Sequence, residues 1–183
     1  VSTLVKTLLG TYTVDKFNAL IKNGSTHNAS FSLVLIYRKP SGKPRRIGLW
    51  DGLQTMSSAV NAKQSFQLGN LEVDSPPEGD LTWYVLEGDV GGSGTEQVSV
   101  TGQPGNKSLV LSDAVNPATN PMNHTINTTT PVQTGSIGVD VDRFNISAAL
   151  TAGDTAVTAN YQAGQDKWWL AYNIVAVNVY EPL

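Results

Sequence analysis

The side chains of this sequence that could carry out chemistry are mainly carboxylates, and they occur in small groups. Asp140 and Asp142 stand two residues apart in a segment with a strand-like pattern, so both side chains fall on one face. Calcium takes about six to eight oxygen ligands in proteins, and paired carboxylates supply some of them. We therefore expect Asp140 and Asp142 to be candidate ligands of a calcium ion, and we expect no other cofactor.

Two other acidic groups flank turns. One surrounds Pro76-Pro77 and the other surrounds Gly88, and together they comprise Asp74, Glu78, Asp80, Glu87 and Asp89. No known calcium-loop motif accompanies them. For all of the acidic groups, the alternative is that the carboxylates cap turns or stay in solvent.

Six asparagines stand in the acceptor pattern for N-linked glycans: Asn23, Asn28, Asn106, Asn123, Asn127 and Asn145. The sequence is rich in Asn, Ser and Thr, so some of these patterns arise by chance. Most of the six fall in segments that read as loops. We expect Asn145 to be modified last, because it lies next to Phe144, a candidate core residue.

Five aromatic residues could form a platform on which a sugar ring stacks: Trp50, Trp83, Tyr84, Trp168 and Trp169. Adjacent residues of a strand point to opposite faces, so at least one of Trp168 and Trp169 belongs in the core. A β-sandwich uses most of its aromatic residues for core packing. Glycan binding is therefore the alternative function and not the preferred one.

The composition argues against an enzyme and against a nucleic-acid partner. The chain has no cysteine and two histidines, which excludes disulfides, thiolate catalysis and cysteine-based zinc sites. No catalytic or nucleotide-binding motif is present. The formal net charge is −3, which does not favour nucleic acid.

No stretch reaches the ~20 apolar residues of a membrane span. The sequence begins with Val1, which indicates a processed mature chain or a fragment.

Runs of β-branched and aromatic residues, several of them alternating, predict an all-β domain. The expected strands are 31–37, 45–50, 81–87, 97–101, 108–111, 155–161 and a long bulged strand, or two strands, over 166–180. The first two should form a hairpin through the turn at 40–44. Short strands separated by Gly and Pro turns are typical of an antiparallel β-sandwich, and a jelly roll is our preferred topology. The polar stretch 116–134 reads as a loop, so one domain should cover 1–183.

Two segments share a short motif and have helical spacing. Val14-Asp15-Lys16-Phe17-Asn18 matches Val141-Asp142-Arg143-Phe144-Asn145. We interpret the pair as a repeated corner, in which the Asp caps a turn, the Phe fills the core and one helical turn crosses the edge of the sandwich. The fold prediction thus includes one or two single-turn helical corners. The residues expected in the core are Phe17, Leu33, Leu35, Trp50, Trp83, Phe144, Leu150 and Val177.

Several of these segments resemble a β-sandwich domain of long, repetitive, adhesin-like surface proteins of bacteria and archaea. The similar stretches are Ser32–Tyr37, Arg45–Gly52, Gly138–Ser147 and Gly153–Thr155, with Asp166 fitting the last strand. The resemblance implies a fold and a surface location, and it implies no active site. Such domains usually open with additional strands before the part matched by Gly10–Phe17. Either the chain is a fragment or another chain completes that edge.

These observations favour an extracellular structural protein of the cell surface, in which copies of the chain assemble into a filament or a surface layer. The alternative is an adhesin-type module that binds glycans. Residues 1–9 are apolar at Val1, Leu4, Val5, Leu8 and Leu9, so we expect this segment to pair with a neighbouring copy or to form the first strand of its own domain.

Overall fold

The computed structural model describes residues 11–18, 29–91 and 95–180, so the segment 1–9 and its predicted pairing lie outside the described residues. The chain divides into two units, Val1–Val34 and Leu35–Leu183. In the first unit, the described residues belong to no helix or strand. Within this unit, the rings of Phe17 and Phe31 meet edge to face with 5.7 Å between centroids. All strands assigned among the described residues belong to the second unit.

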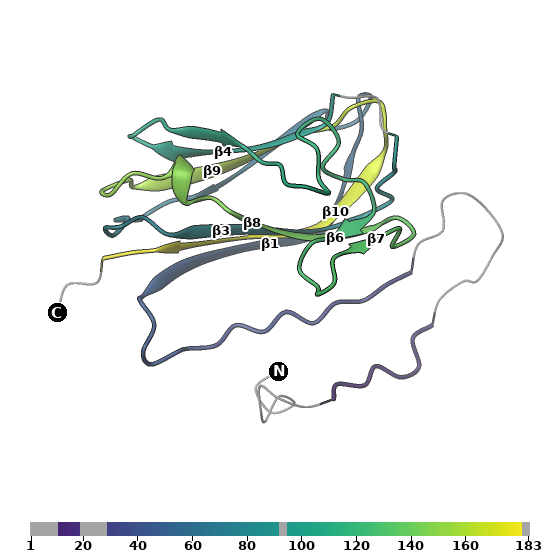
Figure 1. Cartoon of the computed structure of the whole chain (residues 1–183), viewed down its shortest axis with the longest axis horizontal. Coiled ribbons are helices and arrows are strands. Elements are labelled where there is room, and N and C mark those ends of the chain that lie inside the picture. Colours follow the sequence, from purple (N-terminus) through teal and green to yellow (C-terminus); the bar gives the residue numbers. More distant parts are fainter. Residues whose placement is uncertain (1–10, 19–28, 92–94, 181–183) are drawn as a thin grey trace. The chain divides into compact units, whose positions relative to one another are not determined.

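The second unit contains two antiparallel sheets, which form two layers in Figure 1. The first, sheet A, has the strand order β1-β10-β3-β8. These strands are β1 (Arg45–Met56), β10 (Trp168–Asn178), β3 (Gly79–Leu86) and β8 (Val139–Asn145). Strand β10 carries a register shift between Leu170 and Tyr172, which confirms the predicted bulge.

The second sheet, sheet B, has the order β2-β9-β4-β5. Its strands are β2 (Lys63–Leu68), β9 (Ala156–Gln162), β4 (Gln97–Gln103) and β5 (Ser108–Val110). Apart from the β4–β5 hairpin, consecutive strands of these two sheets alternate between them in the manner of a jelly roll, which confirms the predicted fold class. A small ribbon of β6 (Thr125–Ile126) and β7 (Gln133–Thr134) lies within the long loop before β8.

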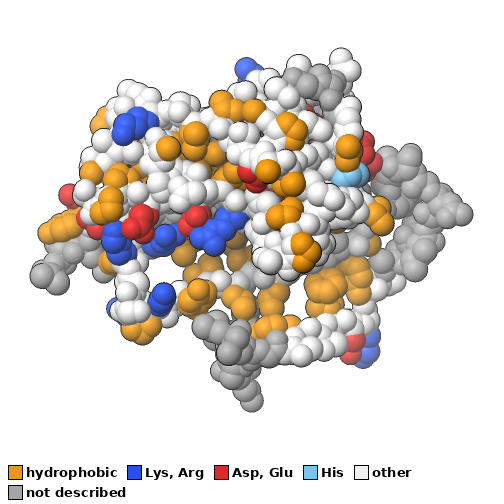
Figure 2. Space-filling view, in the orientation of Figure 1, with side chains coloured by type: hydrophobic (Ala, Val, Ile, Leu, Met, Phe, Trp, Pro, Cys, Tyr) orange, Lys and Arg blue, Asp and Glu red, His pale blue; other side chains and the backbone are white. Residues whose placement is uncertain are grey.

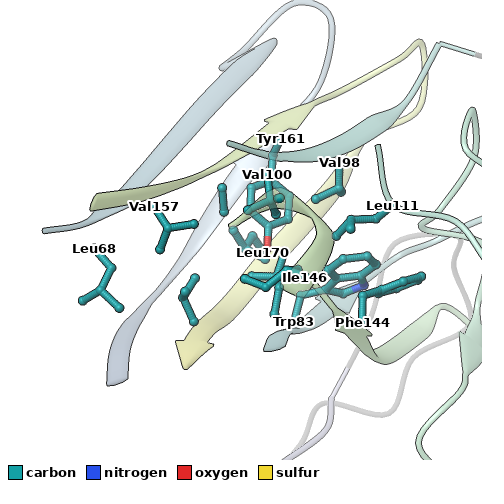
Figure 3. Close-up of a cluster of buried hydrophobic side chains, with 14 of the residues drawn as sticks. Leu68, Trp83, Val98, Val100, Leu111, Phe144, Ile146, Val157, Tyr161 and Leu170 are labelled. Atoms are coloured by element: carbon teal, nitrogen blue, oxygen red, sulfur yellow. The ribbon is translucent and has the colours of Figure 1, made fainter. Parts of the chain in front are cut away.

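The core lies between the two sheets and follows from strand alternation. In β4, Val98 and Val100 are fully buried, while the alternate residues Gln97, Ser99 and Thr101 are partly exposed. Trp83 of β3 and Phe144 of β8 stack with 4.9 Å between ring centroids, and both point into the cluster shown in Figure 3. The predictions that Trp83, Phe144, Leu150 and Val177 are buried are confirmed.

The predicted burial is wrong for Phe17 and Leu33, which are 47% and 49% exposed. Leu35 and Trp50 are partly buried, and Trp50 packs against the core. The segment 31–37 is not a strand, so the predicted hairpin with β1 does not form, although the turn itself closes with a bond from the Gly42 N–H to the Lys39 carbonyl at 3.0 Å. A strand needs a neighbour to take its backbone hydrogen bonds, and no described residue provides them for 31–37.

The repeated corner is correct for only one of its copies. After Phe144, a single 3-10 turn (Ser147–Ala149, η1) crosses between the sheets, as expected. Asp142 does not cap that turn, because β8 continues to Asn145. In the other copy, the described residues 11–18 contain no helix and Phe17 is not a core residue. Five similar residues were therefore not enough to specify the same local structure, since only the second copy lies in a strand.

Candidate functional site

Asp140 and Asp142 lie side by side on one face of β8, as predicted, but that face is the inner one. Both side chains are fully buried and share this face with Phe144. The register places Asp140 opposite Val85 and Asp142 opposite Trp83 of β3. Two carboxylates therefore occupy positions where a sandwich normally places apolar residues.

Asp140 attaches the loop before β8 to the strand. Its Oδ1 accepts the backbone N–H of Asn123 at 2.9 Å and that of Thr125 at 3.1 Å. Its Oδ2 has no hydrogen-bond partner among the described residues. Burial is the main cause that raises the pKa of Asp140 to about 7, and the charge of Asp142 adds to the effect.

Asp142 also attaches the loop before β8 to the strand, through different loop residues. Its Oδ1 accepts the backbone N–H of Asn127 at 3.0 Å and the side-chain amide of Asn116 at 3.2 Å, while its Oδ2 is unpaired among the described residues. Burial, with the charge of Asp113, raises the pKa of Asp142 to about 6. One oxygen of each aspartate thus has the loop-capping role that the sequence left open as the alternative to metal binding.

Glu96 is a third buried carboxylate at this end of the sandwich, and the sequence analysis missed it. Glu96 is fully buried, and neither carboxylate oxygen has a hydrogen-bond partner among the described residues. Burial is the main cause that raises the pKa of Glu96 to about 8, and the charges of Asp166 and Asp140 raise it further. Hydrogen bonding from the Trp168 indole and the Met122 backbone lowers this pKa but does not outweigh burial. A signal was present, because Glu96 is in phase with the buried Val98 and Val100 of β4.

The buried carboxylates have no basic partner among the residues that the structure describes. The ion pairs of the described residues join Lys43, Arg45 and Arg143 only to Glu78 and Asp80. Those surface groups belong to the predicted acidic group around Pro76-Pro77, and they are already neutralised. The space-filling view shows basic and acidic side chains next to each other on the visible face (Figure 2).

No three His, Asp or Glu side chains of the described residues are grouped as a metal ion would require. Asp140 and Asp142 alone do not form such a group, and one oxygen of each is used by the loop. Any ion at this end would therefore combine two carboxylates with neutral oxygens. Whether calcium binds at Asp140 and Asp142 remains a prediction.

The glycosylation candidates lie in different environments. Asn23 and Asn28 are outside the described residues. Asn123 is buried, its Nδ2 donates to the Val115 carbonyl at 2.7 Å, and the Nδ2 of Asn127 donates to Asp113 at 2.8 Å. A glycan would have to fit beside a buried nitrogen at Asn123, and at Asn127 it would replace one of the two Nδ2 hydrogens that bond Asp113 and the Arg143 carbonyl.

Asn106 and Asn145 are exposed, and the Oδ1 of Asn145 accepts the N–H of Ser147 at 3.0 Å. Of the described candidates, these two have the exposed side chains, so the expectation that Asn145 is modified last gains no support from its burial. Occupancy at all six positions remains a prediction.

The aromatic residues do not form a shared exposed surface. Trp83 and Trp168 are fully buried, and Tyr84 is 5% exposed. Trp50 packs on Phe66 with 5.8 Å between ring centroids, and Trp169 is partly covered by Lys167, whose ammonium lies 5.1 Å from the ring centroid. The prediction that one of the paired tryptophans is a core residue is confirmed.

No protein-family model and no curated protein matches this sequence. Among solved structures, the crystal structure of dimeric latent PorU from Porphyromonas gingivalis is similar, with a TM-score of 0.42 and 12% sequence identity. The similarity covers 75% of this chain but only 13% of that chain. A likeness of this size says nothing about function. The described residues contain no helix long and apolar enough to cross a membrane.

Proposed function

We propose that this chain is an extracellular structural protein of a cell surface and that its copies assemble through the outer edge of β1. The observation that carries the proposal is the difference between β1 and the other edges of the two sheets. The surface location is supported by the resemblance to domains of repetitive surface proteins and by the six glycan acceptor patterns.

Strand β1 has the features of an edge that accepts another strand. It is twelve residues long and pairs with β10 on one side only, among the strands that the structure describes. Ile47, Leu49 and Leu53 along it are 39%, 43% and 54% exposed. A long, apolar and unpaired edge readily pairs with a strand of another molecule.

The outer edge of β8 is covered. The Asn127 side chain accepts the Arg143 N–H at 2.8 Å and donates to the Arg143 carbonyl at 3.2 Å. The Thr128 hydroxyl donates to the Val141 carbonyl at 3.2 Å. These side chains occupy the backbone groups that a new strand would need.

Both edges of sheet B are also poor acceptors. Strand β5 has three residues, and β2 starts with Lys63 and is mostly polar. Short edges and charged side chains are the usual protection against strand addition. Strand β1 is the longest of the four edges, and its charged residues are Arg45, Arg46 and Asp51, with a register shift between Asp51 and Gln54.

The chain also contains a suitable strand to donate, Phe31–Tyr37. It is composed of residues that favour strands, and Phe31, Ile36 and Tyr37 are 59%, 65% and 61% exposed. No described residue makes a backbone hydrogen bond with it. Pairing with β1 of a neighbouring copy would satisfy the backbone of both segments and cover their apolar side chains. Successive additions of this kind build a fibre unless the symmetry closes.

Engineered cysteines test this pairing, because the natural chain has none. One batch carries Ile36→Cys, a second carries Leu49→Cys, and the two are mixed under mild oxidation. We expect disulfide-linked heterodimers. The control partner is Val90→Cys, which is at an exposed position outside β1.

Two results would contradict the proposal. Equal cross-linking to Val90→Cys would show random collision. In a chain that carries both Ile36→Cys and Leu49→Cys, closure only within the monomer would show that the segment pairs with its own β1.

A further inference from the structure

The end of the sandwich that holds Glu96 and Asp140 contains more buried acceptors than donors. Six oxygen atoms there have no donor among the described residues, two from Glu96 and one each from Asp140, Asp142, Asp166 and Asn120. The donors that face these carboxylates are the indole N–H groups of Trp168, beside Glu96, and of Trp83, beside Asp142, together with the Met122 N–H beside Glu96. If all three donated, three of the six acceptors would still lack a donor. Buried polar atoms in native proteins are nearly always satisfied, so these acceptors require bound protons, water or a cation.

The loop around Met122 draws these oxygens together. An added Cβ on Gly88 would overlap the Asp140 Oδ2 and lie 2.9 Å from the Met122 carbonyl oxygen, so both oxygens lie close to the Gly88 Cα. That carbonyl accepts the Asp89 N–H at 3.1 Å, and the Asn120 side-chain amide donates to the Asp89 carbonyl at 3.0 Å. The Met122 backbone is also close enough to Glu96 to affect its carboxyl group.

Two buried carboxylates without a basic partner carry a large desolvation cost if they are ionised and uncompensated. A divalent cation would balance both charges at once. We propose that Glu96 and Asp140 bind one calcium ion, with the side-chain oxygen of Asn120 and the Met122 carbonyl as further ligands. Calcium suits such a mixture because it accepts carboxylate, amide and carbonyl oxygens in irregular geometry, whereas magnesium demands a near-octahedral shell.

The proposed site differs from the Asp140–Asp142 pair predicted from the sequence. Asp142 lies two residues from Asp140 in β8. Its Oδ1 accepts hydrogen bonds from Asn127 and Asn116, and its carboxyl group lies beside the Trp83 indole. Asp140 instead has Glu96 as a neighbour across the sandwich. The site would tie the start of β4 to β8, which belong to different sheets. The inference is independent of assembly through β1.

The first test is a thermal unfolding experiment on the full chain in EDTA and in increasing Ca²⁺, with Mg²⁺ as the comparison ion. Calcium at a hundred times its Kd should raise Tm by roughly 5–10 °C, from the linkage relation and the size of the domain. Glu96→Gln should abolish this rise. The matched control is Asp154→Asn, because Asp154 is buried but both of its oxygens accept backbone N–H groups, from Gly105 and Thr151. That variant should keep the rise from a lower starting Tm.

A second measurement covers the case in which Glu96→Gln does not fold. Terbium replaces calcium in oxygen sites and emits when a nearby tryptophan is excited, and the Trp168 indole lies beside Glu96. We expect sensitised emission that Ca²⁺ competes away and that Trp168→Phe reduces. The proposal is overturned if millimolar Ca²⁺ leaves Tm unchanged, if Glu96→Gln responds to Ca²⁺ like the natural chain, or if no competed emission appears. An unchanged Tm combined with a stabilising Glu96→Gln would assign a proton, and not a cation, to these carboxylates.

Discussion

Replacing Phe144 by alanine tests whether the core was placed correctly. Phe144 is 6% exposed, lies on the inner face of β8 and stacks on Trp83 at 4.9 Å between ring centroids. Truncating a buried phenylalanine costs about 3–5 kcal/mol, and the loss of the stacked pair puts this site toward the upper end. For a domain of this size, that corresponds to a fall in Tm of roughly 6–20 °C.

The matched substitution is Phe17→Ala, because Phe17 has the same position in the repeated sequence motif. Phe17 is 47% exposed and contacts Phe31, so its truncation should cost about 1 kcal/mol or less. Urea unfolding followed by tryptophan fluorescence, at one fixed protein concentration, measures both values. Equal losses for Phe144→Ala and Phe17→Ala would refute the reasoning, since Phe17 would then be a core residue as the sequence motif suggested.

Three further predictions follow from single contacts. Asp80→Asn should cost roughly 1–2 kcal/mol, because the Asp80 carboxylate accepts hydrogen bonds from Arg45 and Arg143 at 2.7 and 2.8 Å. Burial opposes ionisation of Asp80, but the two arginines outweigh burial and lower the pKa of Asp80 below 3.8. The stabilisation is therefore complete above about pH 4 and is lost as the pH falls through the folded-state pKa. Measuring Tm across an acid titration will detect this loss. Gly88→Ala should cost at least about 2 kcal/mol in a urea titration, because its Cβ would collide with Asp140 and with backbone, whereas Gly69→Ala meets nothing within 4 Å and should be nearly neutral. Peptide mass spectrometry of the natural chain should find glycan on Asn106 in preference to Asn123, and the reverse order would contradict the described burial of Asn123.

The sheet architecture was predictable because its signals are local. Alternation in 97–101 and 155–161 specified strands β4 and β9 and the faces that they bury. Turn residues separated the strands clearly enough to indicate a jelly roll. The segment 31–37 was predicted wrongly because composition reports a preference for strand, while forming one depends on a partner that the sequence cannot identify.

The candidate site was harder to predict, for a different reason. Asp140 and Asp142 were correctly placed on one face of a strand, but an acidic pair is ordinarily assigned to the solvent face. The informative feature was phase, since both aspartates share the register of Phe144, and Glu96 shares that of Val98 and Val100. A carboxylate that shares the alternation of buried residues is itself expected to be buried, and its desolvation lowers the stability of the fold. The excess of acceptors over donors depends on the loop around Met122, whose course the sequence did not reveal.

The most direct test of the proposed function is the mass of the native chain in solution, measured by size-exclusion chromatography with light scattering over a range of concentrations. Assembly through β1 predicts oligomers that grow with concentration. A variant with Leu33→Asp and Ile36→Asp should remain a monomer, while Val90→Asp, at another exposed apolar position, should assemble like the natural chain. A natural chain that stays monomeric at every concentration, or a double variant that still assembles, would contradict the account.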